Sequence, residues 1–308
     1  MTHRPLRITP TIAALAAGLG LAAAPVARAD RLETPVEAGA NLAAAAGWQA
    51  WSTETAPGTH RLQLRRPDGS VTTPEIPAFG APVDPAIGTR GGADAINTPA
   101  SRRLSAVYSR CAGDSALAGC DVFALDLTTL TEEKVAALAT KAYSETVPSL
   151  TFGNWSLVRR GGGPAKGTYA YSERSGRLRR LSPTLARETA TSVSRMAFTY
   201  NSSRGFGLQI RQSSGDGRPL VAAARLQLEP RSPQLTRYRA GWLLPGDGVT
   251  RVFQTRRFAG SGGPFTLRVD EAPRTLPAGV RSAAGDSSTL FERYLDEEGV
   301  QRIDPAIR

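Results

Sequence analysis

A short run of alternating apolar residues with a turn at its centre recurs along the chain, and it limits the possible folds more than any other feature. The clearest copy is residues 167–183, GTYAYSERSGRLRRLSP, in which Tyr169 and Tyr171 alternate with small residues before a turn at Gly176, and Leu178 follows the turn. Alternation with a period of two and a Gly or Asp at the hinge is typical of a β-hairpin.

The same pattern of alternating apolar residues around a turn appears in several other parts of the chain. Comparable hairpins are predicted in residues 60–71, 120–135 and 206–221. Two further short strands with a tight turn precede several of the hairpins, in residues 148–160, 191–200 and 233–244. Each unit is therefore predicted to contain four antiparallel strands.

Units of roughly 40 to 50 residues with four strands each are typical of β-propeller blades. We predict an all-β propeller of about six four-stranded antiparallel blades in a single domain, residues 30–308, with blades at 41–78, 79–138, 140–183, 184–224, 226–276 and 277–306. The last unit is short of strands, and residues 32–39 would complete it and close the ring, which hides sheet edges. Five or seven blades, or a pair of β-sandwiches, are the alternatives for the same pattern.

The first 29 residues have the features of a secretory signal peptide. Arg4 and Arg7 precede an apolar run, residues 8–26, and Ala27-Arg28-Ala29 fits the cleavage pattern. An uncleaved membrane anchor is the alternative, because the run approaches the length of a membrane span. We expect cleavage, no later transmembrane segment, and a secreted or extracytoplasmic location in the cell envelope or periplasm.

The charge of the chain comes almost entirely from arginine. The net charge is +11, and loss of the three arginines in residues 1–29 leaves +8, while lysine occurs only at positions 134, 141 and 166. Guanidinium groups bind phosphate and carboxylate bidentately, which suits an anionic partner, although a GC-rich genome produces the same bias. The candidate anion-binding loops carry Arg90, Arg102, Arg103, Arg159, Arg160 and Arg204. We expect a monomer that binds an anionic polymer or a protein of the envelope, and no nucleic acid.

Two cysteines bracket the segment CAGDSALAGC, between two predicted strands. A pair of cysteines at the two ends of one polar loop in an exported chain is normally joined. We predict a disulfide between Cys111 and Cys120 that stabilises this loop. A redox role would need Cys-x-x-Cys spacing, which is not present.

The sequence offers little catalytic machinery. His60 is the single histidine left after removal of the leader, and we expect it at the surface at the start of a strand. One histidine cannot build the usual catalytic zinc site, and no calcium loop is present, so we expect no metal or cofactor. The acidic doublets Glu132-Glu133 and Asp270-Glu271 place neighbouring carboxylates on opposite faces of a strand. We predict a non-enzymatic binding or scaffold module, with a polysaccharide lyase or hydrolase as the alternative.

Two further features concern packing. Tryptophans occupy comparable places in their units, at positions 48, 51, 155 and 242, and we expect them to pack between blades. Residues 130–142 could form one short helix, or a last strand followed by a loop.

The sequence pattern of the predicted blades resembles that of TolB-like six-bladed propellers of exported bacterial proteins. The resemblance lies in an apolar pair such as Met196-Ala-Phe198, a strand such as Thr168-Tyr-Ala-Tyr171, a Ser-Gly turn and the run Arg177-Leu-Arg-Arg-Leu181. The Ser-Pro-Asp-Gly box of TolB blades is not repeated here, and residues 66–69 echo it at another place in the unit. The resemblance therefore implies the fold and not the partners of that family.

Overall fold

The computed structural model describes the chain almost continuously from residue 42 to residue 212, and mainly its strands beyond that. The described residues are 32–33, 42–91, 103–112, 119–192, 195–212, 221–226, 229–235, 239–245, 251–258, 267–270, 274–276, 282–286, 289–295 and 301–307. The predicted signal peptide, residues 1–29, and Arg102 lie outside them. No helix long and apolar enough to cross a bilayer is found in the described part.

Four blades, each a four-stranded antiparallel sheet in sequence order, follow one another along the chain. Blade I contains β2 (Ala43–Ala45), β3 (Trp48–Ala56), β4 (Thr59–Arg65) and β5 (Val71–Thr72). Blade II contains β6 (Ala86–Arg90), β7 (Arg103–Cys111), β8 (Cys120–Asp126) and β9 (Glu132–Lys134). Blade III contains β10 (Ser144–Thr151), β11 (Asn154–Arg160), β12 (Gly167–Ser172) and β13 (Arg177–Ser182). Blade IV contains β14 (Ala186–Thr191), β15 (Arg195–Ser202), β16 (Gly205–Gln212) and β17 (Val221–Leu226).

The remaining strands form two more sheets. One contains β18 (Arg231–Leu235), β19 (Arg239–Pro245), β20 (Arg251–Phe258), β21 (Leu267–Asp270) and β22 (Arg274–Leu276). The other contains β23 (Ser282–Asp286), β24 (Thr289–Leu295) and β25 (Gln301–Ile307), and its outer strand is β1 (Leu32–Glu33) from the other end of the chain.

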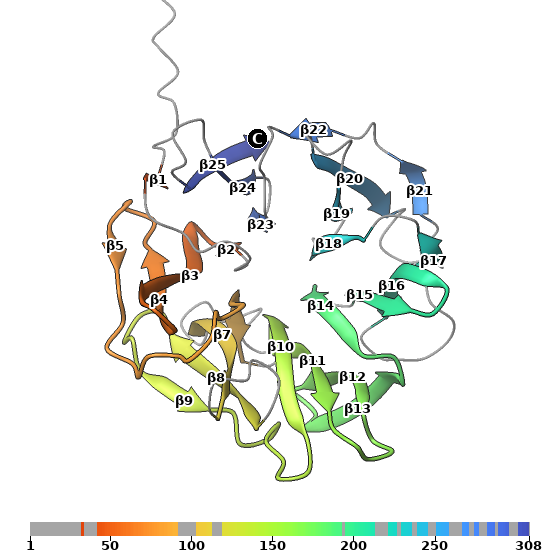
Figure 1. Ribbon diagram of the computed structural model, residues 1–308, viewed down its shortest axis with the longest axis horizontal. Helices are drawn as coiled ribbons and strands as arrows, with labels where there is room; N and C mark the ends of the chain where they lie inside the picture. The colour runs from red at the N-terminus through yellow and green to blue at the C-terminus, as the bar shows by residue number, and fades with distance from the viewer. Residues whose placement is uncertain are drawn as a thin grey trace, which may run out of the picture.

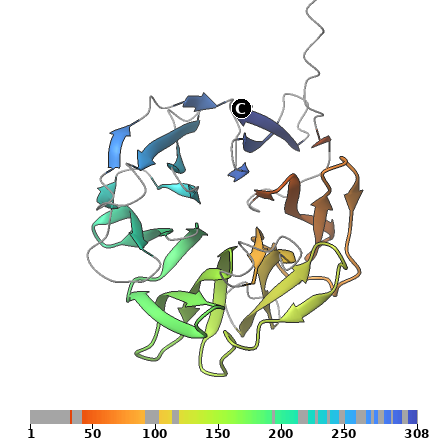
Figure 2. The same ribbon diagram turned by 180° about the vertical axis from the view of Figure 1, so that it is seen from behind.

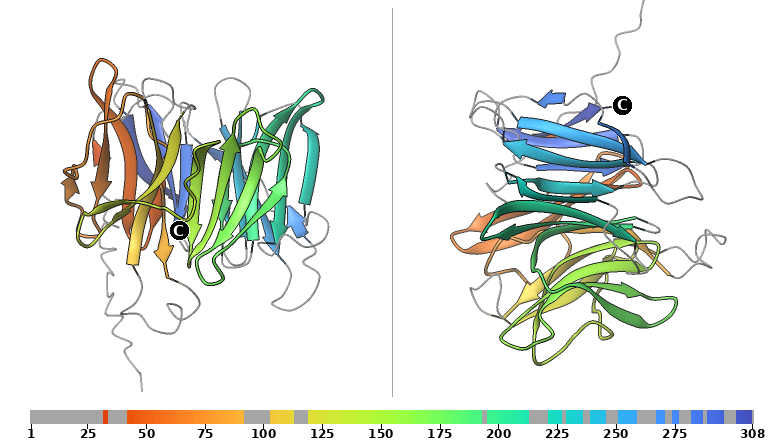
Figure 3. Two further views of the ribbon diagram at one scale, coloured as in Figure 1. Left: turned by 90° about the horizontal axis from the view of Figure 1, so that it is seen from below. Right: turned by 90° about the vertical axis from the view of Figure 1, so that its right-hand side faces the viewer.

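The sheets stand side by side around a common centre (Figure 1), and the view from behind shows the same circular arrangement (Figure 2). The first strand of each blade lies innermost, where β2 contacts β6, β6 contacts β10 and β10 contacts β14. The strands run roughly along the axis of the ring (Figure 3). The prediction of an all-β propeller with antiparallel four-stranded sheets is confirmed, and a pair of stacked β-sandwiches is excluded.

The hydrophobic core lies in the seams between neighbouring blades. Because successive side chains of a strand point to opposite faces, Tyr108 packs in the seam with blade I, while Val107 packs in the seam with blade III. In the same way Leu157 faces blade II and Val158 faces blade IV. Blades II and III therefore each pack through both faces of their sheet.

The tryptophans pack as expected in two of the seams. Trp155 is fully buried with residues of blades II and III, and Trp242 packs on the apolar residues of blade IV. Residues 132–134 form the strand β9 rather than part of a helix. They pair with β8 as the outer strand of blade II, with Glu132 opposite Leu125 and Lys134 opposite Phe123.

The predicted disulfide is confirmed. Cys111 ends β7 and Cys120 begins β8, and the two residues are direct partners across this hairpin. The bond therefore closes the β7–β8 connection at its base. The disulfide belongs to one hairpin and does not link two blades.

Candidate functional site

The connections between strands gather at two opposite ends of the ring. Because neighbouring strands are antiparallel, the turns after the first and third strands of a blade lie at one end, which we call end A. The turn after the second strand and the connection to the next blade lie at the other end, which we call end B.

The predicted anion-binding arginines are divided between these two ends. Arg90 and Arg103 are register partners where β6 and β7 meet end A. Arg159 and Arg160 finish β11 at end B, and Arg204 lies in the β15–β16 turn at the same end. The structure does not bring these residues together in one site. That these loops bind anions stays a prediction.

Arg90 and Arg103 line a cavity of about 370 Å³ at end A, between blades II and III. Its other charged lining residues are Glu133, Lys134 and Glu173. Basic and acidic groups are mixed in this cavity, so it is not a simple anion-binding pocket. We call it the Arg90 cavity.

Arg90 is held between two carboxylates from different blades. Its Nε donates to Glu173 Oε1 at 2.9 Å, and its guanidinium also pairs with Glu133. The second oxygen of Glu173 accepts from the backbone N–H of Gly91 at 2.8 Å. The guanidinium lies 5.8 Å from the centre of the Trp155 ring. Arg90 therefore joins blade II to blade III through a charged hydrogen bond to Glu173 and a cation–π contact with Trp155.

Backbone contacts place Glu173 beside Arg90, although 83 residues separate the two. The N–H of Gly153 donates to Thr89 O at 2.8 Å, and the N–H of Glu173 donates to Gly153 O at 2.8 Å. Gly153 has a positive φ of 67°, and a Cβ there would lie 2.6 Å from Gly91 O. The sequence signal for this contact was the turn Phe152-Gly153, which gives no information about its partner.

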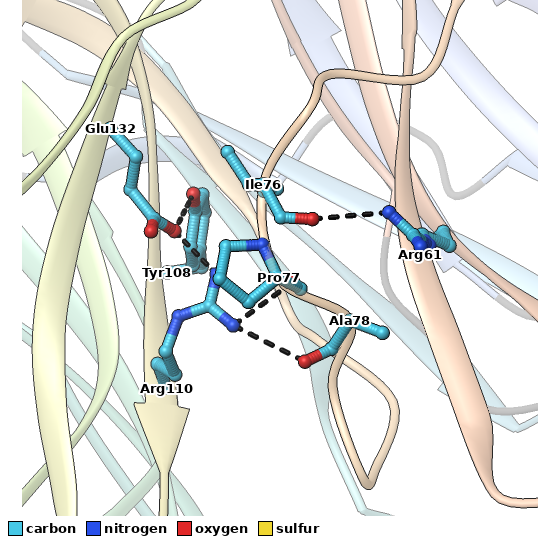
Figure 4. Close-up of polar contacts among 7 residues, drawn as sticks. All are labelled: Arg61, Ile76, Pro77, Ala78, Tyr108, Arg110 and Glu132. Atoms are coloured by element: carbon cyan, nitrogen blue, oxygen red, sulfur yellow. Dashed lines mark hydrogen bonds and ion pairs between the residues drawn. The ribbon is translucent and has the colours of Figure 1, made fainter.

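A second arginine cluster fastens blade I to blade II (Figure 4). Arg110, at the end of β7, donates to the carbonyls of Pro77 at 3.0 Å and Ala78 at 3.3 Å. Its other terminal nitrogen lies 2.5 Å from Glu132, which also accepts from the Tyr108 hydroxyl at 2.6 Å. The segment that precedes blade II is thus held by a side chain of that blade.

This cluster, which we call the Arg110 clamp, is built on aromatic rings. The Arg110 guanidinium lies 4.2 Å from the centre of the Phe79 ring, and Phe79 meets Tyr108 edge to face at 5.5 Å. Tyr108 is fully buried. Burial, and then the hydrogen bond to Glu132, raise the pKa of the Tyr108 hydroxyl well above its usual value.

The acidic doublet in β9 behaves as the alternation of a strand requires. Glu132 belongs to the Arg110 clamp in the seam with blade I, whereas Glu133 belongs to the Arg90 cavity in the seam with blade III. The two carboxylates face opposite seams. This is the placement on opposite faces that the alternation of a strand predicts.

The other two predicted arginines of blade III also make contacts within the protein. Arg159 donates to Leu138 O at 3.1 Å and lies 3.3 Å from Glu145, which is fully buried. Burial raises the pKa of Glu145, and only part of this is offset by a hydrogen bond from Thr140 and by the charge of Arg159. Arg160 donates to Thr146 Oγ1 and to Ala186 O of blade IV, both at 3.0 Å.

A cavity of about 620 Å³ lies at end B beside Arg160. Lys134 and Lys141 line it, together with Tyr143 and Asp121. Lys134 already pairs with Asp121 at 2.6 Å. This cavity is the more basic of the two, and its walls come from the β9–β10 and β11–β12 connections.

The expectation for His60 was wrong. Its side chain is 5% exposed rather than at the surface. The reason lies in the segment after β5, which returns to β4 so that His60 and Phe79 exchange both backbone hydrogen bonds. No group of three His, Cys, Asp or Glu residues suited to a metal ion occurs in the part of the chain that the structure describes.

The geometry defines a β-propeller whose seams are fastened by charged clamps. Among solved structures, the fold is similar to TolB from Acinetobacter baumannii, at 11% identity and a TM-score of 0.52, over 84% of this chain and 64% of that one. The chain thus spans about 64% of the length of that TolB. It is also similar to a chain of the mitotic checkpoint complex, at 11% identity and a TM-score of 0.54, over 97% of this chain and 100% of that one.

These likenesses concern the fold alone, because the identities are low. The predicted fold-level resemblance to TolB-like propellers is confirmed. No protein-family model matches the sequence, and no curated protein matches it.

Proposed function

We propose that the protein is an exported β-propeller that binds a partner or serves as a scaffold and has no catalytic machinery of its own. In this proposal residues 30–308 form one domain, a ring of six blades, with β18–β22 as the fifth and β23–β25 as the sixth. The pairing of β1 with β25, which sets Leu32 opposite Ile303, supports a ring closed by the N-terminal strand. Contacts of β23 with both β2 and β18 support the same closure.

The observation that carries the non-enzymatic part is that the ionisable side chains around Arg90 and Arg110 are already paired with one another. Arg90 is held by Glu133 and Glu173, and Arg110 by Glu132. A tyrosine that acts as a base needs a pKa near the working pH, whereas the pKa of Tyr108 is raised. Because these arginines and carboxylates are already paired, we assign them to holding the blades together and not to binding a substrate.

An extracytoplasmic location and an anionic partner complete the proposal. The signal peptide predicted at residues 1–29 and the Cys111–Cys120 disulfide both support export, because disulfides persist in oxidising compartments. The likeness of the fold to TolB is in keeping with this location. The excess of arginine supports an anionic polymer or an acidic protein of the envelope as the partner.

The experiment is capture of envelope components on the immobilised protein at low salt and at about 0.5 M salt, where exposed charges are screened. We expect one or more anionic components that are bound at low salt and released at high salt, identified by mass spectrometry and sugar analysis. Capture that is equal at both salt concentrations, or no capture at all, would contradict an anionic partner.

A hydrolase or lyase remains the second candidate because of the Arg90 cavity. Glu133 and Glu173 both line it, with Tyr171 beside them, and glycosidases use two carboxyl groups across one substrate. The test is turnover of a panel of anionic and neutral polysaccharides by the wild type and by Glu173→Gln. Turnover that is lost in the variant would establish the enzyme and overturn the non-enzymatic proposal.

A further inference from the structure

The outer edge of blade III carries a group of arginines that take no part in the seam contacts described above. The hairpin of β12 and β13 carries four arginines within seven residues, Arg174, Arg177, Arg179 and Arg180. Its one acidic residue, Glu173, is engaged by Arg90 and Gly91 on the neighbouring blade. No other carboxylate within the hairpin is therefore available to these arginines.

Three of these arginines are exposed and make no hydrogen bond or ion pair in the described part of the protein. Arg174 lies in the turn, and Arg177 and Arg180 lie on β13. This sets them apart from Arg90, Arg110 and Arg159 at the strand ends, which all reach across a seam to oxygen atoms. Since no hydrogen bond or ion pair of the described residues occupies their guanidinium groups, these side chains are available to another molecule.

The backbone of β13 is available as well. β13 is the last strand of its sheet, paired with β12 on one side, and no described strand pairs with its other side. It has six residues, whereas the outer strands β5 and β9 have two and three. The outer strand β17 is equally long but has a single arginine in VAAARL. Figure 1 shows β13 at the rim of the ring.

We propose that the β13 edge binds an extended acidic peptide segment of a partner protein, which adds to blade III as a fifth strand. Strand addition uses the unpaired N–H and C=O groups of an edge for affinity, and side chains for specificity. The arginines of β13 point to both faces of the sheet, and the side chains of an added strand do the same. A flat lipid surface would meet only one of the two sets, so the geometry favours a peptide.

Charge on an edge strand also protects against unwanted pairing, and the two roles agree here. Arginines of a single sign repel a second copy of the same edge, but they attract a strand that carries carboxylates. Guanidinium groups bind carboxylates bidentately, which fixes the register of the added strand. The inference rests on the proposed binding function and names the surface and the chemistry of the partner.

The experiment uses the purified full chain and a fluorescent eight-residue peptide of the sequence Glu-Glu-Thr-Val repeated twice, which carries carboxylates on both faces of an extended strand. We expect saturable binding by anisotropy and slower hydrogen exchange of the β13 amides. The variant Arg177→Glu/Arg180→Glu should bind about tenfold more weakly or worse, since like charges replace opposite ones across the strands. The matched control Arg66→Glu/Lys166→Glu changes the net charge equally, at exposed sites in a turn of blade I and a loop of blade III, and should bind like the wild type.

A second peptide of the same sequence, N-methylated at alternate backbone nitrogens, separates strand addition from attraction by charge alone. It keeps all carboxylates but cannot complete the ladder of hydrogen bonds, and we expect it not to bind. Equal binding of the two peptides, or equal loss in the control variant, would overturn the proposal.

Other occupants of the edge would also be recognised. Self-association of the wild type that is lost in Arg177→Glu/Arg180→Glu would name a second copy of the chain, and binding to anionic vesicles without peptide binding would name a membrane. Either result overturns the peptide proposal. The envelope capture tests the function separately: an anionic partner that is retained by Arg177→Glu/Arg180→Glu leaves the binding function intact and removes only the β13 edge.

Discussion

A close approach between two inner strands gives a sharp test of how the ring is packed. Gly88 on β6 faces Leu150 on β10, the first strand of the next blade. A Cβ on Gly88 would overlap the carbonyl oxygen of Leu150 and lie 2.5 Å from its carbonyl carbon, whereas real Cβ atoms stay at least 3.0 Å from such atoms. Both obstacles are backbone atoms, so no side-chain rotation relieves the overlap.

The size of the effect follows from this geometry. Carbon atoms pack at about 3.5–4.0 Å, so β10 must move away from β6 by about 1 Å in Gly88→Ala. The movement loosens a seam in which Leu150 is only 2% exposed. Overpacking of a core costs about 1–3 kcal/mol. Because the obstacles here are backbone atoms, which cannot rotate away, we expect a loss of unfolding free energy at the upper end of this range, about 3 kcal/mol. The melting temperature should then fall by about 6–12 °C.

The assay is urea unfolding followed by tryptophan fluorescence, with Gly162→Ala as the matched control. Gly162 has no heavy atom within 4 Å of an added Cβ and no positive φ, so its substitution should change the free energy of unfolding little. If Gly88→Ala unfolds at the same urea concentration as Gly162→Ala, the inner strands do not approach as described and the reasoning fails.

Three further predictions concern the hairpin, the clamp and a buried acid. Replacing Cys111 and Cys120 by Ser should lower the free energy of unfolding by about 2–3 kcal/mol, and a reductant should have the same effect on the wild type but none on the variant. Tyr108→Phe should cost about 1–2 kcal/mol because the hydrogen bond to Glu132 is lost, and no loss in thermal unfolding would contradict the clamp. Because the folded state raises the pKa of Glu145 above 4.5, this group removes stability as pH rises above 4.5 through the folded pKa. Glu145→Gln should therefore gain stability relative to the wild type over that rise, and a difference that stays constant from pH 4 to pH 8 would refute the assignment.

The repeated hairpin contained enough information for the fold, because strand alternation and turn chemistry are local. The alternation of Tyr169, Tyr171 and Leu178 predicted a strand on each side of Gly176, and these strands are β12 and β13. The Cys111–Cys120 pair was equally local, since the two residues are partners in one hairpin.

The seam contacts could not be predicted in the same way. Arg90 meets Glu173 only because the turn at Gly153 lies against Thr89, and nothing near Arg90 in the sequence indicates this. The burial of His60 likewise depends on a return of the chain to β4 at Phe79. Such contacts depend on how two blades, or two distant segments, are placed relative to each other.

The same distinction explains which arginines are free to bind. An arginine at the end of the first or second strand of a blade finds carbonyls or carboxylates of a neighbouring blade or connection within reach, as Arg90, Arg110 and Arg159 do. An arginine on an outer strand has no next blade beside it. Arg177 and Arg180, on the outer strand β13, are exposed, whereas three of the arginines predicted in the loops contact the ring. The expected binding surface therefore lies at the β13 edge rather than at the ends of the ring.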